Sequence, residues 1–186
     1  MILVRSPLRI TLGGGGTDLL AYYKRHGGMF VTAAIEAYVY VSVLKPFEPG
    51  ILLKYGHCGT EKVATIDQIA HPLIREALRL CAPLGWTPQV EITTLADVPA
   101  GTGLGSSSAC ACALLKALTT FFEPDARGSC LDLAENACHL EMHVLREPVG
   151  KQDAYASAFG GLTPFTINER GDVSTQLGID WRIQER

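Results

Sequence analysis

The segment PAGTGLGSSSA, residues 99–109, constrains this chain more than any other part of its sequence. Glycine at positions 101, 103 and 105 lets the backbone take positive φ angles and approach a ligand without a Cβ clash. Loops of this kind turn several N–H groups inward and form an anion-binding nest. The apolar run that follows, to about Phe122, predicts a buried helix whose N-terminal amides and positive dipole end attract phosphate.

Two familiar nucleotide-binding loops do not fit this segment. A Walker A loop requires Gly-Lys-Ser/Thr, whereas the nearest lysine, Lys116, comes about three turns into the predicted helix. A Rossmann loop reads GxGxxG, whereas these glycines give GxGxG followed by Ser106. The three consecutive serines supply hydroxyls for a phosphate or for Mg²⁺. The alternative is a glycine-rich turn with a serine N-cap and no ligand.

A second cluster, SPLRITLGGGGTDL, occupies residues 6–19. Its four consecutive glycines end a predicted strand and leave open space for a ligand, and Thr17 and Asp18 then present polar groups at a helix start. Asp18 can accept hydrogen bonds from substrate hydroxyls, and Arg9 can place a fixed positive charge nearby. The alternative is that Asp18 only caps its helix and that Arg9 lies at a strand edge.

The third cluster, HLEMHVLREPVGKQDAYASAFGG, spans residues 139–161. Glu141 lies on a predicted helix, and Asp153 follows the break at Pro148–Gly150. Carboxylates on either side of a turn can serve two roles, one holding Mg²⁺ and the other accepting a proton from a substrate hydroxyl. Lys151 is expected to help keep Asp153 ionised. The alternative places Glu141 on a solvated helix face and makes Asp153 an acid of a first helical turn.

His139 and His143 in the same cluster are spaced i,i+4, so they can share a helix face as zinc ligands. The zinc motif HExxH puts its glutamate directly after the first histidine, whereas Glu141 follows His139 by two residues. No third ligand is evident either. The zinc interpretation therefore lacks both the motif and a complete ligand set.

The predicted elements run from strands first to helices later, which favours an α+β fold over alternating βαβ units. Runs of β-branched and aromatic residues predict strands at 2–12, 30–35, 38–44, 51–55, 62–66, 89–95, 162–167 and 173–177. Helical spacing of apolar residues predicts helices at 19–25, 67–81, 129–145 and 150–160, besides the helix that ends near 122. Thr17 or Asp18 is expected to cap the first of these helices, and Asp67 the second.

Composition excludes several classes of protein. The 186 residues carry a net charge of −3 without a basic run, so we expect no nucleic-acid or membrane partner. The longest uncharged stretch, 98–115, is rich in glycine and serine and is not a membrane span. Six cysteines form no CxxC pair, and Arg5 and Arg9 interrupt the apolar N-terminus, so buried reduced thiols and a cytoplasmic location are expected.

Together the three clusters resemble the motifs of the GHMP kinase superfamily, which includes galactokinase, homoserine kinase, mevalonate kinase and phosphomevalonate kinase. PAGTGLGSSSA resembles the family's phosphate loop, PxxxGLGSSA, and Arg9, Thr17 and Asp18 match the first motif, PGRVNLxGEHTD in galactokinase. Gly15 and Gly16 replace the Glu-His pair of that motif, so galactose is not the expected substrate. GGGGTDL and GKQDAYASAFGG are most similar to the bacterial D-glycero-D-manno-heptose 7-phosphate kinase branch.

The resemblance implies a two-layer α+β sandwich like domain 2 of ribosomal protein S5. It also implies that residues 1–186 form the N-terminal, ATP-binding domain of a kinase whose C-terminal domain lies outside this chain. The implied cofactors are ATP and Mg²⁺, and the implied acceptor is a small sugar or sugar phosphate. A nucleotide- or sugar-binding module without turnover is the alternative, because the C-terminal half of the family's cleft is not in this sequence.

The resemblance also assigns roles to individual residues. It implies a substrate site of Gly15, Gly16, Thr17 and Asp18, magnesium ligands Ser107 and Glu141, and catalytic roles for Asp153, Arg9 and Lys151. The ATP-binding residues that it implies are Pro99, Ala100, Gly101, Thr102, Gly103, Leu104, Gly105, Ser106, Ser107 and Ser108.

Overall fold

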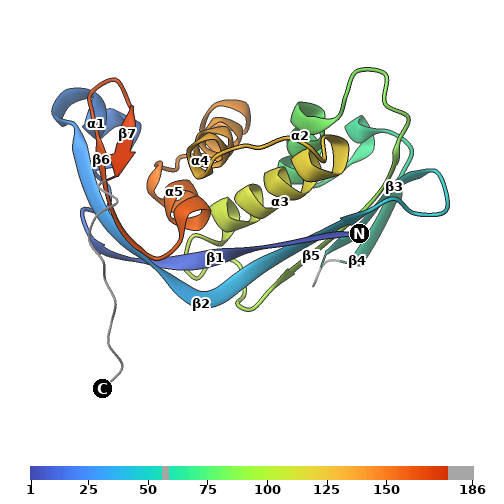
Figure 1. The fold of residues 1–186 in the computed structure, drawn as a ribbon, viewed down its shortest axis with the longest axis horizontal. Helices are drawn as coiled ribbons and strands as arrows, with labels where there is room; N and C mark the ends of the chain where they lie inside the picture. The colour runs from blue at the N-terminus through green and yellow to red at the C-terminus, as the bar shows by residue number, and fades with distance from the viewer. Residues whose placement is uncertain (56–58, 176–186) are drawn as a thin grey trace.

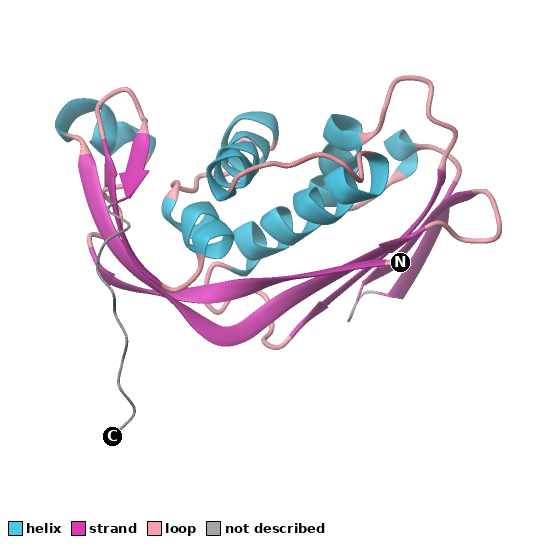
Figure 2. Cartoon of the chain, in the orientation of Figure 1, coloured by secondary structure: helices cyan, strands magenta, loops and turns pink. Residues whose placement is uncertain are grey.

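A computed structural model describes residues 1–55 and 59–175, and in it helices α2 to α5 cover one face of a curved sheet (Figures 1 and 2). The strands are β1 (Ile2–Gly13), β2 (Gly28–Leu44), β3 (Gly50–Tyr55), β4 (Gly59–Val63), β5 (Gln89–Ala96), β6 (Leu162–Ile167) and β7 (Val173–Thr175). The α-helices are α1 (Leu20–His26), α2 (Pro72–Cys81), α3 (Ser106–Phe122), α4 (Cys130–Cys138) and α5 (Gln152–Phe159). This two-layer α+β arrangement confirms the predicted fold class.

The sheet is built around β2, which pairs with neighbours along both of its edges. β1 runs antiparallel along one edge, and along the other β2 pairs antiparallel with β6 near its start and with β5 near its end. The strand order is β4-β3-β5-β2-β6-β7, with β1 beside β2. Among the described strands, β3 and β5 form the one parallel pair, and α2 lies in the crossover between them.

Two predicted strands, 30–35 and 38–44, are one continuous strand, β2. The register with β1 shifts at this point, where Pro7 faces Tyr38 and Arg9 faces Ala34. A bulge of this kind bends a strand and increases its twist, so β2 can serve both ends of the curved sheet. The prediction was wrong because a bulge and a turn both interrupt the alternation of apolar side chains.

The predicted helix 67–81 begins later than expected, so the expected capping role of Asp67 is wrong. Asp67 lies in a separate 3₁₀ turn, Ile66–Gln68, whose capping residue is Thr65. α2 itself starts at Pro72, a residue that suits a first helical turn because that turn needs no backbone N–H. The expected strand 173–177 is described to Thr175, and its last two residues lie outside the described residues.

The predicted helix 129–145 is helical over nearly its whole length but changes form. Ser129 caps α4 and accepts a hydrogen bond from the Asp132 N–H at 3.1 Å. After Cys138 the chain widens into a π-helical turn, His139–Val144. Such turns are rare and occur often at functional sites. Here the widened turn carries Glu141.

α3 is the central helix of the core and packs on β1 and β2 as well as on α2, α4 and α5. Small side chains allow these neighbours to approach closely. The buried residues of α3 are Ser108, Ala109, Ala111, Cys112, Ala113, Leu114, Leu115, Ala117 and Leu118. Within the described residues, no helix is both long enough and apolar enough to cross a membrane.

The described cysteines are all free thiols. Cys112 and Cys138 are buried, and burial raises the pKa of both thiols and keeps them protonated. The expectation of buried thiols holds for these two, while Cys58 lies outside the described residues. The others range from half-buried to exposed, at Cys81, Cys110 and Cys130.

Candidate active site

The loop between β5 and α3 takes the conformation that its glycines predict. Gly101, Gly103 and Gly105 have φ angles of 82°, 74° and 76°, all in the left-handed region that favours glycine. Gly105 is the N-cap residue of α3, and no side chain of the described residues caps the helix. Among the described residues, the amides of the first turn of α3 therefore have no side-chain cap, and they can bind an anion.

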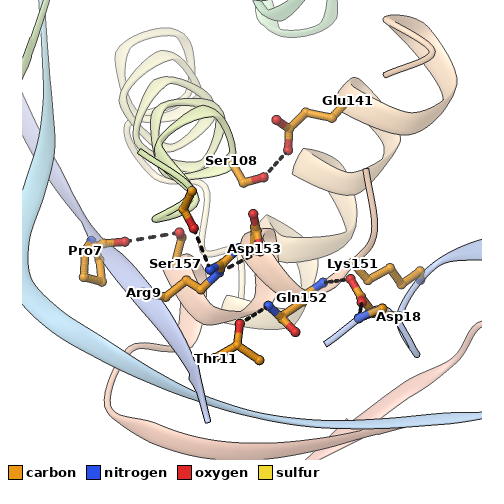
Figure 3. A network of polar contacts seen from close by, with 12 residues as sticks. Pro7, Arg9, Thr11, Asp18, Ser108, Glu141, Lys151, Gln152, Asp153 and Ser157 are labelled. Atoms are coloured by element: carbon orange, nitrogen blue, oxygen red, sulfur yellow. Dashed lines mark hydrogen bonds and ion pairs between the residues drawn. The ribbon is translucent and has the colours of Figure 1, made fainter. Parts of the chain in front are cut away.

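Glu141 reaches this helix start from the π-helical turn. Its Oε1 accepts a hydrogen bond from the Ser107 hydroxyl at 2.7 Å, and its Oε2 accepts one from the Ser108 hydroxyl at 2.5 Å. Glu141 is only 1% exposed, and burial raises the pKa of its carboxyl although the two serine hydroxyls act in the opposite direction. Figure 3 shows Glu141 directed at Ser108 on α3.

Arg9 and Asp153 meet on the other side of the loop. Both Nε and Nη2 of Arg9 bind Asp153 Oδ1, at 2.8 and 2.6 Å, and Nη1 donates to the Gly103 carbonyl at 3.0 Å. Asp153 Oδ2 faces the loop, because a Cβ added to Gly105 would lie 3.3 Å from it. The glycine loop is thus flanked by a buried carboxylate and by a half-exposed carboxylate that an arginine orients (Figure 3).

Lys151 does not assist Asp153, which corrects the sequence-based expectation. Its Nζ binds Glu135 Oε1 at 2.7 Å and the Gly171 carbonyl at 2.8 Å, and the residue is buried. Residues two apart on a helix point to opposite sides, so Lys151 and Asp153 at the start of α5 cannot share a partner. Arg9, which is remote in sequence, supplies the positive charge instead.

The predicted substrate-binding side chains of the first motif are engaged inside the protein. The Thr17 hydroxyl lies 2.8 Å from the Gly14 carbonyl and 2.9 Å from the Met29 carbonyl, and these two acceptors share its single hydrogen. Asp18 is buried and accepts hydrogen bonds from the backbone N–H groups of Gly16 and Gln152, each at 3.0 Å. Neither residue caps α1, whose N-cap residue is Leu19.

The backbone of Gly15 and Gly16 stays open to solvent. A Cβ at Gly16 would meet no atom within 4 Å among the described residues. The predicted acceptor site therefore keeps its glycine surface, while the Thr17 and Asp18 side chains stabilise it from behind.

Gln152 is a polar residue of this region that sequence reasoning missed. Its Nε2 donates to the Thr11 hydroxyl, while its buried Oε1 has no hydrogen-bond partner within residues 1–55 and 59–175. Oε1 would lie 3.9 Å from a Cβ on Gly15, so it sits directly behind the glycine surface. The only sequence signal was its position immediately before Asp153.

A pocket of about 940 Å³ opens beside the first part of the glycine loop. Its wall includes the stacked rings of Tyr55 and His71, whose centroids lie 5.6 Å apart. Glu61 closes one side and accepts hydrogen bonds from the Tyr55 hydroxyl at 2.6 Å and the Ala70 N–H at 2.9 Å. The remaining wall comes from β2, β4, β5, α2, α3 and the glycine loop, so no single sequence segment could reveal it. It includes Val39, Thr60, Leu73, Thr94, Leu95, Ala96, Val98, Pro99, Ala100, Gly101, Ser106, Ser107 and Cys110.

The zinc interpretation gains no support from the described residues. His139 and His143 do lie together, with ring centroids 5.6 Å apart. Residues 1–55 and 59–175 contain no group of three or more His, Cys, Asp or Glu side chains arranged to hold a metal ion. Within those residues, the two histidines have none of the further ligands that a zinc site requires.

Comparison with known proteins agrees with this geometry. Residues 72–161 match the family described as "GHMP kinases N terminal domain". The chain is 27% identical to a D-glycero-alpha-D-manno-heptose 7-phosphate kinase of Campylobacter jejuni, over 99% of this chain and 56% of that protein. It is 29% identical to a mevalonate kinase of Archaeoglobus fulgidus, over 86% of this chain and 51% of that protein.

Among solved structures, a D-glycero-D-manno-heptose 1-phosphate kinase from Bacteroides thetaiotaomicron superposes with a TM-score of 0.85 at 26% identity. The superposition covers 95% of this chain and 59% of that one. The chain thus spans about half the length of the curated relatives that it matches. In its glycine loop, its two carboxylates and these matches, the chain is similar to GHMP kinases, and residues 72–161 match their N-terminal domain.

Proposed function

We propose that residues 1–186 form the ATP-binding domain of a kinase that transfers the γ-phosphoryl group of ATP to a hydroxyl of a sugar or sugar phosphate. The observation that carries the proposal is the glycine loop flanked by Glu141 on one side and Asp153 on the other. Phosphoryl transfer asks a protein mainly to position its substrates and to stabilise charge. An open helix N-terminus with oriented carboxylates supplies both.

ATP fits the loop and the neighbouring pocket together. The amides of the loop and of the first turn of α3 can bind the phosphates, with Ser106, Ser107 and Ser108 adding hydroxyls. The pocket opens beside the loop and has room for the base, with Tyr55 and His71 in its wall. ATP as a substrate also agrees with the cytoplasmic location that we propose.

Magnesium fits the oxygen donors at the start of α3. Mg²⁺ prefers one or two carboxylates together with phosphate oxygens and water, and Glu141 with Ser107 offers a carboxylate and a hydroxyl at one place. When bound, Mg²⁺ would neutralise charge on the phosphates. Hydrogen bonds from the Ser107 and Ser108 hydroxyls hold the buried Glu141 carboxylate at the start of α3 and so orient these oxygen donors.

The acceptor hydroxyl would approach Asp153 Oδ2 over the glycine surface of Gly15 and Gly16. Arg9 occupies Oδ1 and keeps the carboxylate turned toward the loop, which leaves Oδ2 to orient the hydroxyl or to take its proton. Because two similar proteins are named as heptose phosphate kinases, we propose D-glycero-D-manno-heptose 7-phosphate as the first acceptor to test.

The test is release of ADP by the purified protein with Mg·ATP and a panel of heptose 7-phosphates, hexoses and mevalonate-type alcohols. ADP release that depends on a sugar or sugar phosphate supports the proposal, and dependence on a mevalonate-type alcohol alone contradicts the sugar assignment. Calorimetric titration with Mg·ATP separates the alternative function, because binding without ADP release on any acceptor favours a binding module without turnover.

A further inference from the structure

Asp18 lies between the glycine surface and the start of α5, and the proposed reaction requires these two segments to keep a fixed position relative to each other. Its Oδ1 accepts a hydrogen bond from the Gly16 N–H in the glycine surface, and its Oδ2 accepts one from the Gln152 N–H at the start of α5. Asp153 is the next residue of that helix. One carboxylate therefore joins the proposed acceptor surface to the helix that carries the proposed base.

The start of α5 depends on this carboxylate. Its N-cap residue is Lys151, whose side chain makes no capping hydrogen bond, so Asp18 supplies the acceptor that a helix start needs from a distant part of the chain. Asp18 as a whole residue is 6% exposed. Both of its oxygens are thus held by backbone amides and turned away from solvent.

The backbone at Gly150 packs directly against the Asp18 carboxylate. A Cβ added at Gly150 would lie 1.9 Å from Asp18 Oδ2 and 2.6 Å from its Cγ. The φ angle of Gly150 is not in the left-handed region, so glycine is required here by the carboxylate and not by the backbone. The two residues therefore fit together as one structural unit.

We propose that Asp18 is a positioning residue, whose carboxylate holds α5 against the glycine surface and so keeps Asp153 at the phosphate loop. The proposal rests on the proposed function, and it differs from a direct sugar contact in a measurable way. A residue that contacts the sugar changes the KM of the acceptor. A residue that positions the base changes kcat and leaves the acceptor KM nearly unchanged.

The experiment compares Asp18→Asn, Gly150→Ala and the control Gly128→Ala, whose Cβ would meet no described atom within 4 Å. Asparagine keeps one accepting oxygen and loses the other, and alanine at 150 displaces the carboxylate without facing the acceptor. Both variants are expected to lower kcat about tenfold with the acceptor KM within about threefold, while the control leaves both unchanged. Nucleotide affinity is expected to stay constant, because Asp18 does not touch the phosphate loop.

A double variant and hydrogen exchange provide two further tests of the positioning role of Asp18. In Asp18→Ala the carboxylate that an alanine at 150 would strike is gone, and only the backbone carbonyl of residue 18, 3.1 Å from that Cβ, remains. Adding Gly150→Ala to Asp18→Ala is therefore expected to cost much less than Gly150→Ala costs in the unaltered protein. Hydrogen exchange is expected to be faster at the α5 amides in Asp18→Asn. A raised acceptor KM with normal kcat in Asp18→Asn, or unchanged α5 exchange, would overturn the inference. Failure of the proposed function is distinct, because the unaltered protein would then release no ADP.

Discussion

The Arg9 guanidinium binds a single oxygen of Asp153, Oδ1, through Nε at 2.8 Å and Nη2 at 2.6 Å. The two residues are 144 positions apart in the sequence. The remaining nitrogen of the guanidinium, Nη1, donates to the Gly103 carbonyl of the glycine loop at 3.0 Å. One side chain thus links the proposed nucleotide site to the proposed base. This geometry leads to the first prediction.

Arg9→Lys is expected to lower kcat about tenfold or more, because an ammonium cannot bind Asp153 and the Gly103 carbonyl in one planar fork. The matched control is Arg5→Lys on the same strand, where the guanidinium lies over the Tyr38 ring at 4.5 Å. Steady-state ADP release measures both. Equal activity of the two variants would mean that the fork has no role in turnover.

Asp153→Ala is expected to lower kcat at least about a hundredfold while Mg·ATP still binds, because a base or orienting carboxylate contributes to turnover and not to nucleotide affinity. The control is Asp125→Ala, an exposed acid in the segment after α3. Turnover and calorimetry are measured on the same preparations. Near-normal kcat in Asp153→Ala would remove this residue from the mechanism.

Glu141→Gln is expected to change how stability depends on pH. Burial raises the pKa of the Glu141 carboxyl above its ordinary 4.5, so the folded protein holds this proton more tightly than the unfolded chain. This carboxyl therefore lowers the free energy of unfolding progressively as pH rises from about 4.5 through its folded-state pKa. Glutamine removes that loss.

Thermal melts without nucleotide test this effect. The Tm of Glu141→Gln relative to the unaltered protein should rise between about pH 4 and about pH 7. Magnesium-dependent turnover of the same variant should fall about tenfold or more, because a carboxylate ligand is lost. A Tm difference that does not vary with pH would show that burial does not disfavour the charged carboxylate.

Lys151→Met is expected to destabilise the protein without impairing catalysis. The buried Nζ joins Glu135 to the Gly171 carbonyl, so its removal should cost about 1–2 kcal/mol of unfolding free energy, limited because Glu135 is half-exposed. Lys116→Met on the exposed side of α3 is the control. Chemical denaturation and kinetics are measured together. A large loss of kcat at unchanged stability would contradict this prediction and support a catalytic role for Lys151.

Ala96→Trp is expected to weaken Mg·ATP binding about tenfold or more, because the indole would fill part of the pocket beside the phosphate loop. Ala64→Trp, at an exposed position after β4, controls for the effect of adding an indole. Calorimetry reports the Kd of each variant. Unchanged affinity in Ala96→Trp would mean that the nucleotide does not occupy this pocket.

Local features of this protein were predictable because their causes are local. Alternating glycines at 101, 103 and 105 impose a left-handed loop, and the apolar run after them forms a helix whatever it packs against. The same holds for the α+β class, which follows from the order of the elements. The prediction of two strands in place of β2 was wrong. The bulge that interrupts its apolar alternation depends on how β2 pairs with β1, and the local sequence does not show that pairing.

The partners of the charged side chains were decided by tertiary structure. Lys151 is two residues from Asp153, yet the helix turns it toward Glu135, and Arg9 arrives from β1 in its place. Asp18 became a buried link to α5 rather than an exposed group at a helix start. Sequence by itself determined which conformations the backbone could take, since these depend on neighbouring residues. Only the packed fold decided which charges meet, because that depends on which distant elements lie side by side.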